Sequence, residues 1–174
     1  MNRLFFFPDF HRYVLLETEV LQALYAHAQR STGCKEAGGE LYTADPHAPG
    51  LVIRTASGPN PSDHRSRHRF NPDFASAARD RDEQFRRGFH AVGLWHTHPE
   101  SQPRPSRLDR ETTLAYMRGF NGDRARYLMV IMGNAGDPPE VIVCSAEANS
   151  ECPWVELCEV PERELYGEGG LWMG

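Results

Sequence analysis

The chain has 174 residues, of which 40% are hydrophobic and 25% are charged, and its formal net charge is −5. This composition is typical of a globular protein that is long enough to bury one core. The acidic balance argues against a nucleic-acid-binding protein, because such proteins usually carry a net positive charge.

The first residues, MNRLFFFPDF, contain an apolar run of only four residues, from Leu4 to Phe7, before Pro8 interrupts it. A signal peptide has a longer apolar stretch, and a transmembrane helix needs about 20 residues. We therefore expect a cytoplasmic protein that does not contact a membrane.

The first half of the chain predicts one helix and two strands. TEVLQALYAHAQR, residues 18–30, has apolar residues at helical spacing, with Thr18 as the expected N-cap. Residues 40–43 and 50–57 read as two strands that pair through the turn DPHAPG. SGPNPSDHRSRHRF, residues 57–70, is expected to be a polar loop.

The second half alternates helices and strands. Residues 72–89 predict an amphipathic helix whose inward side chains are Phe74, Ala77, Ala78 and Phe85. The segments expected to follow are a buried strand at 91–96, a helix at 106–120, and strands at 126–133 and 140–146. Alternating strands and helices predict an α/β layered fold in a single domain. From about residue 146 to 174 the chain is expected to be an irregular extension.

The most informative stretch is GLWHTHPESQPRPSRLD, which follows the buried strand. His96 and His98 are two residues apart, so on an extended segment both imidazoles point to one face. The loop then leads to Ser106 and Asp109 at the start of a helix, where the aspartate can turn back toward the histidines. Two histidines and one carboxylate leave a tetrahedral zinc one open position for water, as in catalytic sites. Ser106 and Asp109 alone, however, also match a common helix-capping pattern.

The complete segment HTHPESQPRPSRLD resembles the JAMM (MPN⁺) motif of zinc metalloproteases, which include deubiquitinating isopeptidases and their prokaryotic relatives. The resemblance covers about residues 14–145 and implies the JAMM (MPN) fold, a mixed central β-sheet flanked by helices. It further implies that zinc is held by His96, His98 and Asp109. It also implies a catalytic glutamate near an upstream strand. KEAGGELY resembles that element and assigns the role to Glu36, as the general base that moves a proton from water to the leaving amine. Glu40 is the alternative base, although within a strand it could instead face solvent. Ser106 is expected to stabilise the oxyanion.

A finer resemblance concerns SGPNPSDHRSRHRF, which is similar to a segment of bacterial JAMM proteins from integrative and conjugative elements. Some of these relatives are deconjugating peptidases of CBASS antiphage operons. The resemblance implies cleavage of an amide bond at the C-terminus of a ubiquitin-like or CD-NTase-like protein joined to a target.

The same segment contains Arg65, Arg67 and Arg69, which an extended chain would present on one face. One interpretation is an edge that guides an extended C-terminal tail of the substrate. The other is a solvated basic loop paired with the protein's own acids. Nucleic acid is not an expected partner, because aromatic stacking residues are lacking nearby.

The main alternative to an enzyme is a catalytically silent MPN scaffold that only binds other proteins. Silent members of the family lose metal ligands or the glutamate. This chain retains all five positions, His96, His98, Ser106, Asp109 and Glu36. We therefore expect a zinc isopeptidase.

Overall fold

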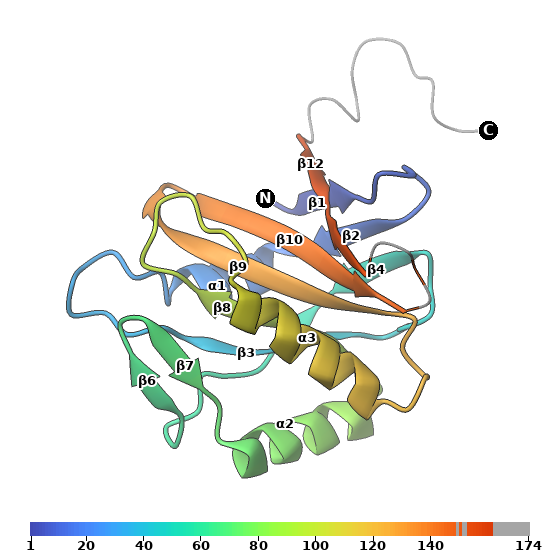
Figure 1. The fold of residues 1–174 in the computed structure, drawn as a ribbon, viewed down its shortest axis with the longest axis horizontal. Coiled ribbons are helices and arrows are strands. Elements are labelled where there is room, and N and C mark those ends of the chain that lie inside the picture. Colours follow the sequence, from blue (N-terminus) through green and yellow to red (C-terminus); the bar gives the residue numbers. More distant parts are fainter. Residues whose placement is uncertain (149, 151–152, 162–174) are drawn as a thin grey trace.

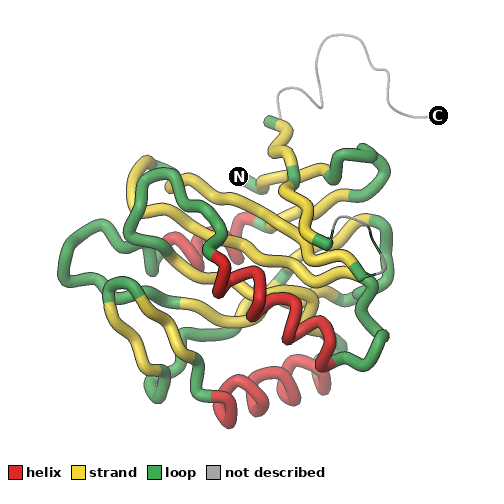
Figure 2. The backbone as a smooth tube through the Cα atoms, in the orientation of Figure 1, coloured by secondary structure: helices red, strands yellow, loops and turns green. Residues whose placement is uncertain are grey.

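The computed structural model describes residues 1–148, 150 and 153–161. Three helices and twelve strands are present in this part of the chain (Figures 1 and 2). The helices are α1 (Thr18–Tyr25), α2 (Phe74–Arg86) and α3 (Arg107–Gly119). The strands are β1 (Arg3–Phe6), β2 (Tyr13–Leu16), β3 (Gly38–Thr43), β4 (Gly50–Ile53), β5 (Thr55–Ala56), β6 (His64–Ser66), β7 (Arg69–Asn71), β8 (His90–Thr97), β9 (Arg126–Gly136), β10 (Pro139–Glu147), β11 (Trp154–Glu156) and β12 (Cys158–Val160).

The strands form one large sheet, one smaller sheet and a hairpin. The six-stranded sheet has the order β11-β10-β9-β8-β3-β5, and only its β8–β9 pair is parallel. The four-stranded sheet has the order β12-β1-β2-β4, and β6 and β7 form the hairpin. The mixed sheet and flanking helices confirm the predicted fold class.

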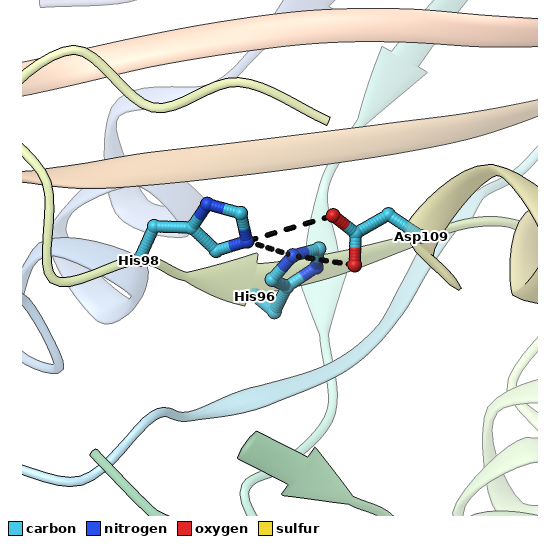
Figure 3. A group of neighbouring side chains, drawn as sticks. All are labelled: His96, His98 and Asp109. Carbon is cyan, nitrogen blue, oxygen red and sulfur yellow. Dashed lines mark hydrogen bonds and ion pairs between the residues drawn. The ribbon is translucent and has the colours of Figure 1, made fainter. Parts of the chain in front are cut away.

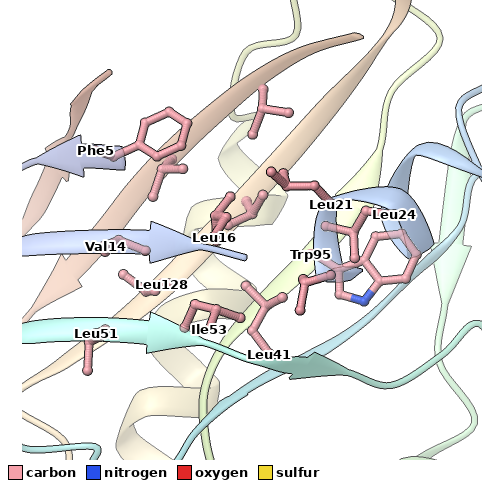
Figure 4. Packing of buried hydrophobic residues seen from close by; sticks show 14 of the residues in the cluster. Phe5, Val14, Leu16, Leu21, Leu24, Leu41, Leu51, Ile53, Trp95 and Leu128 are labelled. Atoms are coloured by element: carbon pink, nitrogen blue, oxygen red, sulfur yellow. The ribbon is translucent and has the colours of Figure 1, made fainter. Parts of the chain in front are cut away.

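The two faces of the six-stranded sheet bury different clusters. On one face, Trp95 and Leu128 pack with Leu21 and Leu24 of α1 and with the four-stranded sheet (Figure 4). On the other face, α3 covers a cluster at the middle of β8 and β9 (Figure 1). That cluster comprises Leu94, Met117, Tyr127, Met129, Ile131 and Ala146. Because side chains alternate along a strand, His96 shares the face of Leu94, whereas Trp95 lies in the opposite core.

Several predicted elements differ from the structure at their ends. The strand expected at 50–57 is split at Arg54, so β4 pairs parallel with β2 while β5 pairs antiparallel with β3. The predicted loop at 57–70 contains most of the β6–β7 hairpin, and the extension expected to be irregular contains β11 and β12. The helix expected at 18–30 ends at Tyr25. Its N-cap is Glu17 rather than Thr18, and the amide and the hydroxyl of Thr18 both donate to Asn2 Oδ1.

The inward face predicted for α2 is wrong except at Ala77. Phe74 and Phe85 are 73% and 65% exposed, and Ala78 is also exposed. The helix instead turns a polar face toward the sheet, where Arg81 forms an ion pair with the buried Glu40 of β3. The face of α2 that bears Arg81 therefore lies against β3, and the face that bears Phe74 and Phe85 is exposed. None of the helices in the described residues is long and apolar enough to cross a membrane.

Candidate metal centre

His96 and His98 lie at the end of β8, and their imidazoles converge on the same point (Figure 3). Their Nε2 atoms are 2.8 Å apart, and the two residues are 8% and 9% exposed. The backbone holds this geometry, because the amide of His98 donates to the carbonyl of Met132 at 2.8 Å. The predicted same-face arrangement of the two histidines is therefore present.

Asp109 completes the cluster from the first turn of α3. Its amide donates to Ser106 Oγ at 3.1 Å, and its Oδ2 accepts from the amide of Ser106 at 2.6 Å. This reciprocal capping box fixes the carboxylate so that Oδ1 lies 3.3 Å from His96 Nε2 and Oδ2 lies 3.6 Å from His98 Nε2 (Figure 3). The capping pattern and the ligand pattern are thus satisfied by the same residues.

The three side chains fit a tetrahedral metal ion. Bonds of about 2.0–2.1 Å at tetrahedral angles place neighbouring donors about 3.3 Å apart. Here the two Nε2 atoms are 2.8 Å apart, and they lie 3.3 Å from Oδ1 and 3.6 Å from Oδ2 of Asp109. Within the described residues, this is the group of three potential ligands that could hold a metal ion. All three face one cavity of about 310 Å³, so a fourth ligand can reach the ion from that side.

The charges of the cluster support cation binding. Burial alone would raise the pKa of Asp109, but hydrogen bonds from His96 and His98 hold that pKa well below its usual range. Burial alone would lower the pKa of His98, but Asp109 raises it above its ordinary value. Glu100 Oε2 also lies 3.3 Å from His98 Nδ1, the position from which a carboxylate orients a ligand imidazole. Sequence analysis gave Glu100 no role, although it is two residues beyond His98.

Glu36 lies in the segment that leads into β3 and lines the same cavity as the histidines. Its amide donates to the carbonyl of Ser66 at 2.8 Å, and its carbonyl accepts from Arg65 Nε at 2.5 Å. The residue is 8% exposed, and burial raises the pKa of its carboxyl to about 7. Glu36 can therefore hold or release a proton near neutral pH.

Glu40 lines the cavity too, but its surroundings differ from those of Glu36. It is only 2% exposed, so a solvent-facing Glu40 is wrong. Its carboxylate accepts from Arg81 Nε at 2.9 Å and from the hydroxyl of Tyr42 at 3.2 Å. Glu40 is therefore the ion-pair partner of Arg81 and connects β3 to α2.

The three arginines of the hairpin do not share one continuous extended face, because the chain turns between β6 and β7. Arg65 donates to the backbone carbonyls of Glu36 and Lys35, and Arg67 donates to that of Ser31 at 2.9 Å. Arg69 is exposed and lines the cavity. The predicted presentation of all three on one face is wrong, and their part in substrate binding stays a prediction.

Gln29 is a residue that sequence analysis did not single out. It is 1% exposed, and its Oε1 accepts from Thr97 Oγ1 at 3.1 Å, while its Nε2 donates to the carbonyl of Arg67 at 2.8 Å. Thr97 Oγ1 in turn accepts from the amide of Ala37 at 3.0 Å. One buried amide thus connects the histidine strand, the Glu36 segment and the hairpin. Gln29 falls within the helix predicted at 18–30, so the sequence pattern gives no sign of this role. The helix ends at Tyr25, before Gln29.

Comparison with known proteins identifies the family. The model of the prokaryotic homologs of the JAB domain matches residues 17–147, which include every residue of the metal cluster and Glu36. The chain belongs to this family. The relationship predicted from the HTHPESQPRPSRLD segment is thereby confirmed. The match leaves β1, β2, β11 and β12 outside its bounds.

Two curated relatives of this JAB-family protein carry the name CD-NTase/cGAS isopeptidase. The one from Escherichia coli (strain TW11681) is 33% identical over 112 residues, which are 63% of this chain and 71% of the relative. The one from Pseudomonas aeruginosa (strain BWHPSA011 / Pa011) is 34% identical over 93 residues, 52% of this chain and 58% of the relative. The solution structure of a Desulfitobacterium hafniense protein matches with a TM-score of 0.57 at 18% identity, covering 83% of this chain and 88% of that one, which supports the fold alone.

Proposed function

We propose that this JAB-family protein is a zinc isopeptidase that hydrolyses the amide bond between the C-terminus of a CD-NTase-like or ubiquitin-like protein and a target amine. The observation that carries the proposal is the convergence of His96, His98 and Asp109 on one point beside Glu36 in a shared cavity. The names of the two curated relatives support the choice of a CD-NTase conjugate as substrate. The antiphage role implied by the family resemblance is part of the same proposal.

Zinc fits this site, and His96, His98 and Asp109 would hold it. When bound, it supplies Lewis acidity that polarises the scissile carbonyl and makes water a stronger nucleophile. Glu36 accepts the proton of the attacking water and delivers it to the nitrogen as the C–N bond breaks. The products are the carboxylate of the tail and the free amine of the target.

In this proposal, Ser106 stabilises the negative charge that develops on the carbonyl oxygen. Its Oγ accepts a hydrogen bond from the amide of Asp109, so its hydroxyl hydrogen remains free to donate. The residue lines the same cavity as Glu36. A donor fixed by a helix cap does not need to reorganise as the charge forms, which is the condition for effective oxyanion stabilisation.

The first experiment is the metal content of the wild type and of His98→Ala by plasma mass spectrometry. We expect about one zinc per chain in the wild type and none in the variant. No zinc in the wild type, even after zinc is added, would contradict the proposal.

The second experiment is cleavage of a CD-NTase joined through its C-terminus to a lysine of another protein, followed on gels. The zinc-loaded wild type should release both proteins, whereas Glu36→Gln should retain zinc and leave the conjugate intact. A zinc-loaded wild type that binds the conjugate but never cleaves it would favour the scaffold alternative.

A further inference from the structure

The β6–β7 hairpin and the residue before Glu36 carry a group of cations beside the cavity. We call this group the cationic rim, and it consists of Lys35, Arg65, Arg67 and Arg69. Of its members, Arg69 lines the cavity that contains the metal ligands, together with its neighbour His68. An extended segment that leaves the cavity on this side therefore passes along the rim.

The rim has no ion-pair partner among the residues that the structure describes. In that part of the chain no carboxylate forms an ion pair with Lys35 or with the three arginines, although six other arginines have such partners. The described carboxylates therefore give no support to the interpretation of the loop as paired with the protein's own acids.

The hydrogen bonds of the rim leave its charge and many of its donors available. Arg65 and Arg67 donate to backbone carbonyls, which carry no net charge. Each guanidinium has five N–H donors, so each keeps unused ones. Arg69 donates to Asn71 Oδ1 at 3.4 Å, and both Arg69 and Lys35 are exposed. The backbone bonds of Arg65 and Arg67 hold the hairpin in place, and the exposed charges of the rim are those of Lys35 and Arg69.

We propose that the cationic rim recognises acidic side chains in the extended tail of the substrate, close to the scissile bond. The proposal rests on the proposed function, because it takes the cavity as the place where that bond is cleaved. The whole chain has a net charge of −5, so its overall field repels an acidic peptide. Since salt screens charges over about 8 Å at physiological ionic strength, a preference for acidic residues has to come from a local cluster such as this rim.

The test measures binding by fluorescence anisotropy, with fluorescein-labelled eight-residue peptides that differ only at three central positions, which are Asp, Asn or Lys. We expect the Asp peptide to bind at least about tenfold more tightly than the Asn peptide at low salt, and the ratio to fall at high salt. Lys35→Gln/Arg69→Gln should bring the ratio close to one, because it removes two exposed charges and leaves the bonds of Arg65 and Arg67 intact. Arg86→Gln, an exposed change at the end of α2, is the matched control and should keep the ratio.

Equal binding of the Asp and Asn peptides to the wild type would overturn the proposal. So would tighter binding of a single-stranded oligonucleotide of the same length than of the Asp peptide. Cleavage of conjugates with Asp or Asn tails separates this proposal from the proposed function. If both conjugates are cleaved with equal KM, the proposed recognition of acidic tails is overturned and the proposed isopeptidase activity stands. If the Asp peptide binds more tightly but neither conjugate is cleaved, the proposed isopeptidase activity is overturned and the recognition of acidic tails stands.

Discussion

The two sides of the cavity are built in different ways. The metal side comes from one stretch, residues 96–109, in which the end of β8 and the first turn of α3 place three ligands by local spacing and a helix cap. The carboxylate side comes from the Glu36 segment and the hairpin, which reach their places through the buried amide of Gln29 and the guanidinium of Arg65. Local geometry fixes the ligands, and long-range hydrogen bonds fix the proposed base.

This difference implies a separation of effects. Changes of the metal ligands His96, His98 and Asp109 should remove the metal and with it all activity. Changes on the carboxylate side should reduce turnover while the metal stays bound.

The largest effect is expected within the capping box. Asp109→Ala should abolish both zinc binding and cleavage, because it removes a ligand. Ser106→Ala should retain zinc, lose about 10²–10³ in kcat with the oxyanion donor, and lose about 1 kcal/mol of stability with the cap. Metal analysis, kinetics and urea unfolding measure the three quantities. Loss of zinc from Ser106→Ala would show that the cap itself is required to hold Asp109 toward the histidines.

The ligand side could be predicted from sequence because its information is local. The two-residue spacing of His96 and His98 fixes their common face, and the capping pattern fixes the start of α3. The arrangement of the carboxylate side could not be predicted from the sequence. It depends on contacts between residues far apart in the chain, such as the hydrogen bond between Gln29 and Thr97. The rotation of α2 was missed for the same reason. Its pattern is apolar at Phe74 and Phe85, yet the buried Glu40 on a distant strand selects the face that bears Arg81.

The next effect distinguishes the two glutamates of the carboxylate side. Glu40→Gln should lower the free energy of unfolding by about 2 kcal/mol, since it leaves Arg81 without a charged partner. Arg81 is itself partly exposed, which keeps the loss below that of a fully buried pair. Urea unfolding measures the loss, and Glu40→Gln/Arg81→Gln should recover part of it. A stable, zinc-loaded but inactive Glu40→Gln would move the proposed base from Glu36 to Glu40.

A smaller effect is expected at Gln29, which touches neither the metal ligands nor the cavity. Gln29→Leu leaves the hydroxyl of Thr97 and the carbonyl of Arg67 without their partner, so the Glu36 segment loses its alignment with β8. We expect kcat to fall about tenfold, which corresponds to about 1.4 kcal/mol, with KM and zinc content nearly unchanged. Gln22→Leu is the matched control, because it makes the same change at an exposed position of α1. A Gln29→Leu protein that loses zinc would show that the two sides are not independent.

The smallest effect concerns the pH dependence of the metal-free protein. The pKa of Glu36 is about 7 in the folded state and about 4.5 when unfolded, so the folded state keeps a proton that the unfolded chain has released. Stability therefore falls as the pH rises from about 5 to 7, and the loss is complete above pH 7. Glu36→Gln removes this dependence, so in a chelator it should be more stable than the wild type at pH 8, by an amount on the order of 1 kcal/mol, and similar at pH 5. The exposed Glu140→Gln is the control and should keep the wild-type slope in urea unfolding across this range. If Glu36→Gln keeps the wild-type pH dependence of stability, burial does not raise the pKa of Glu36. The carboxylate side would then lack the raised pKa that suits Glu36 to accept a proton near neutral pH.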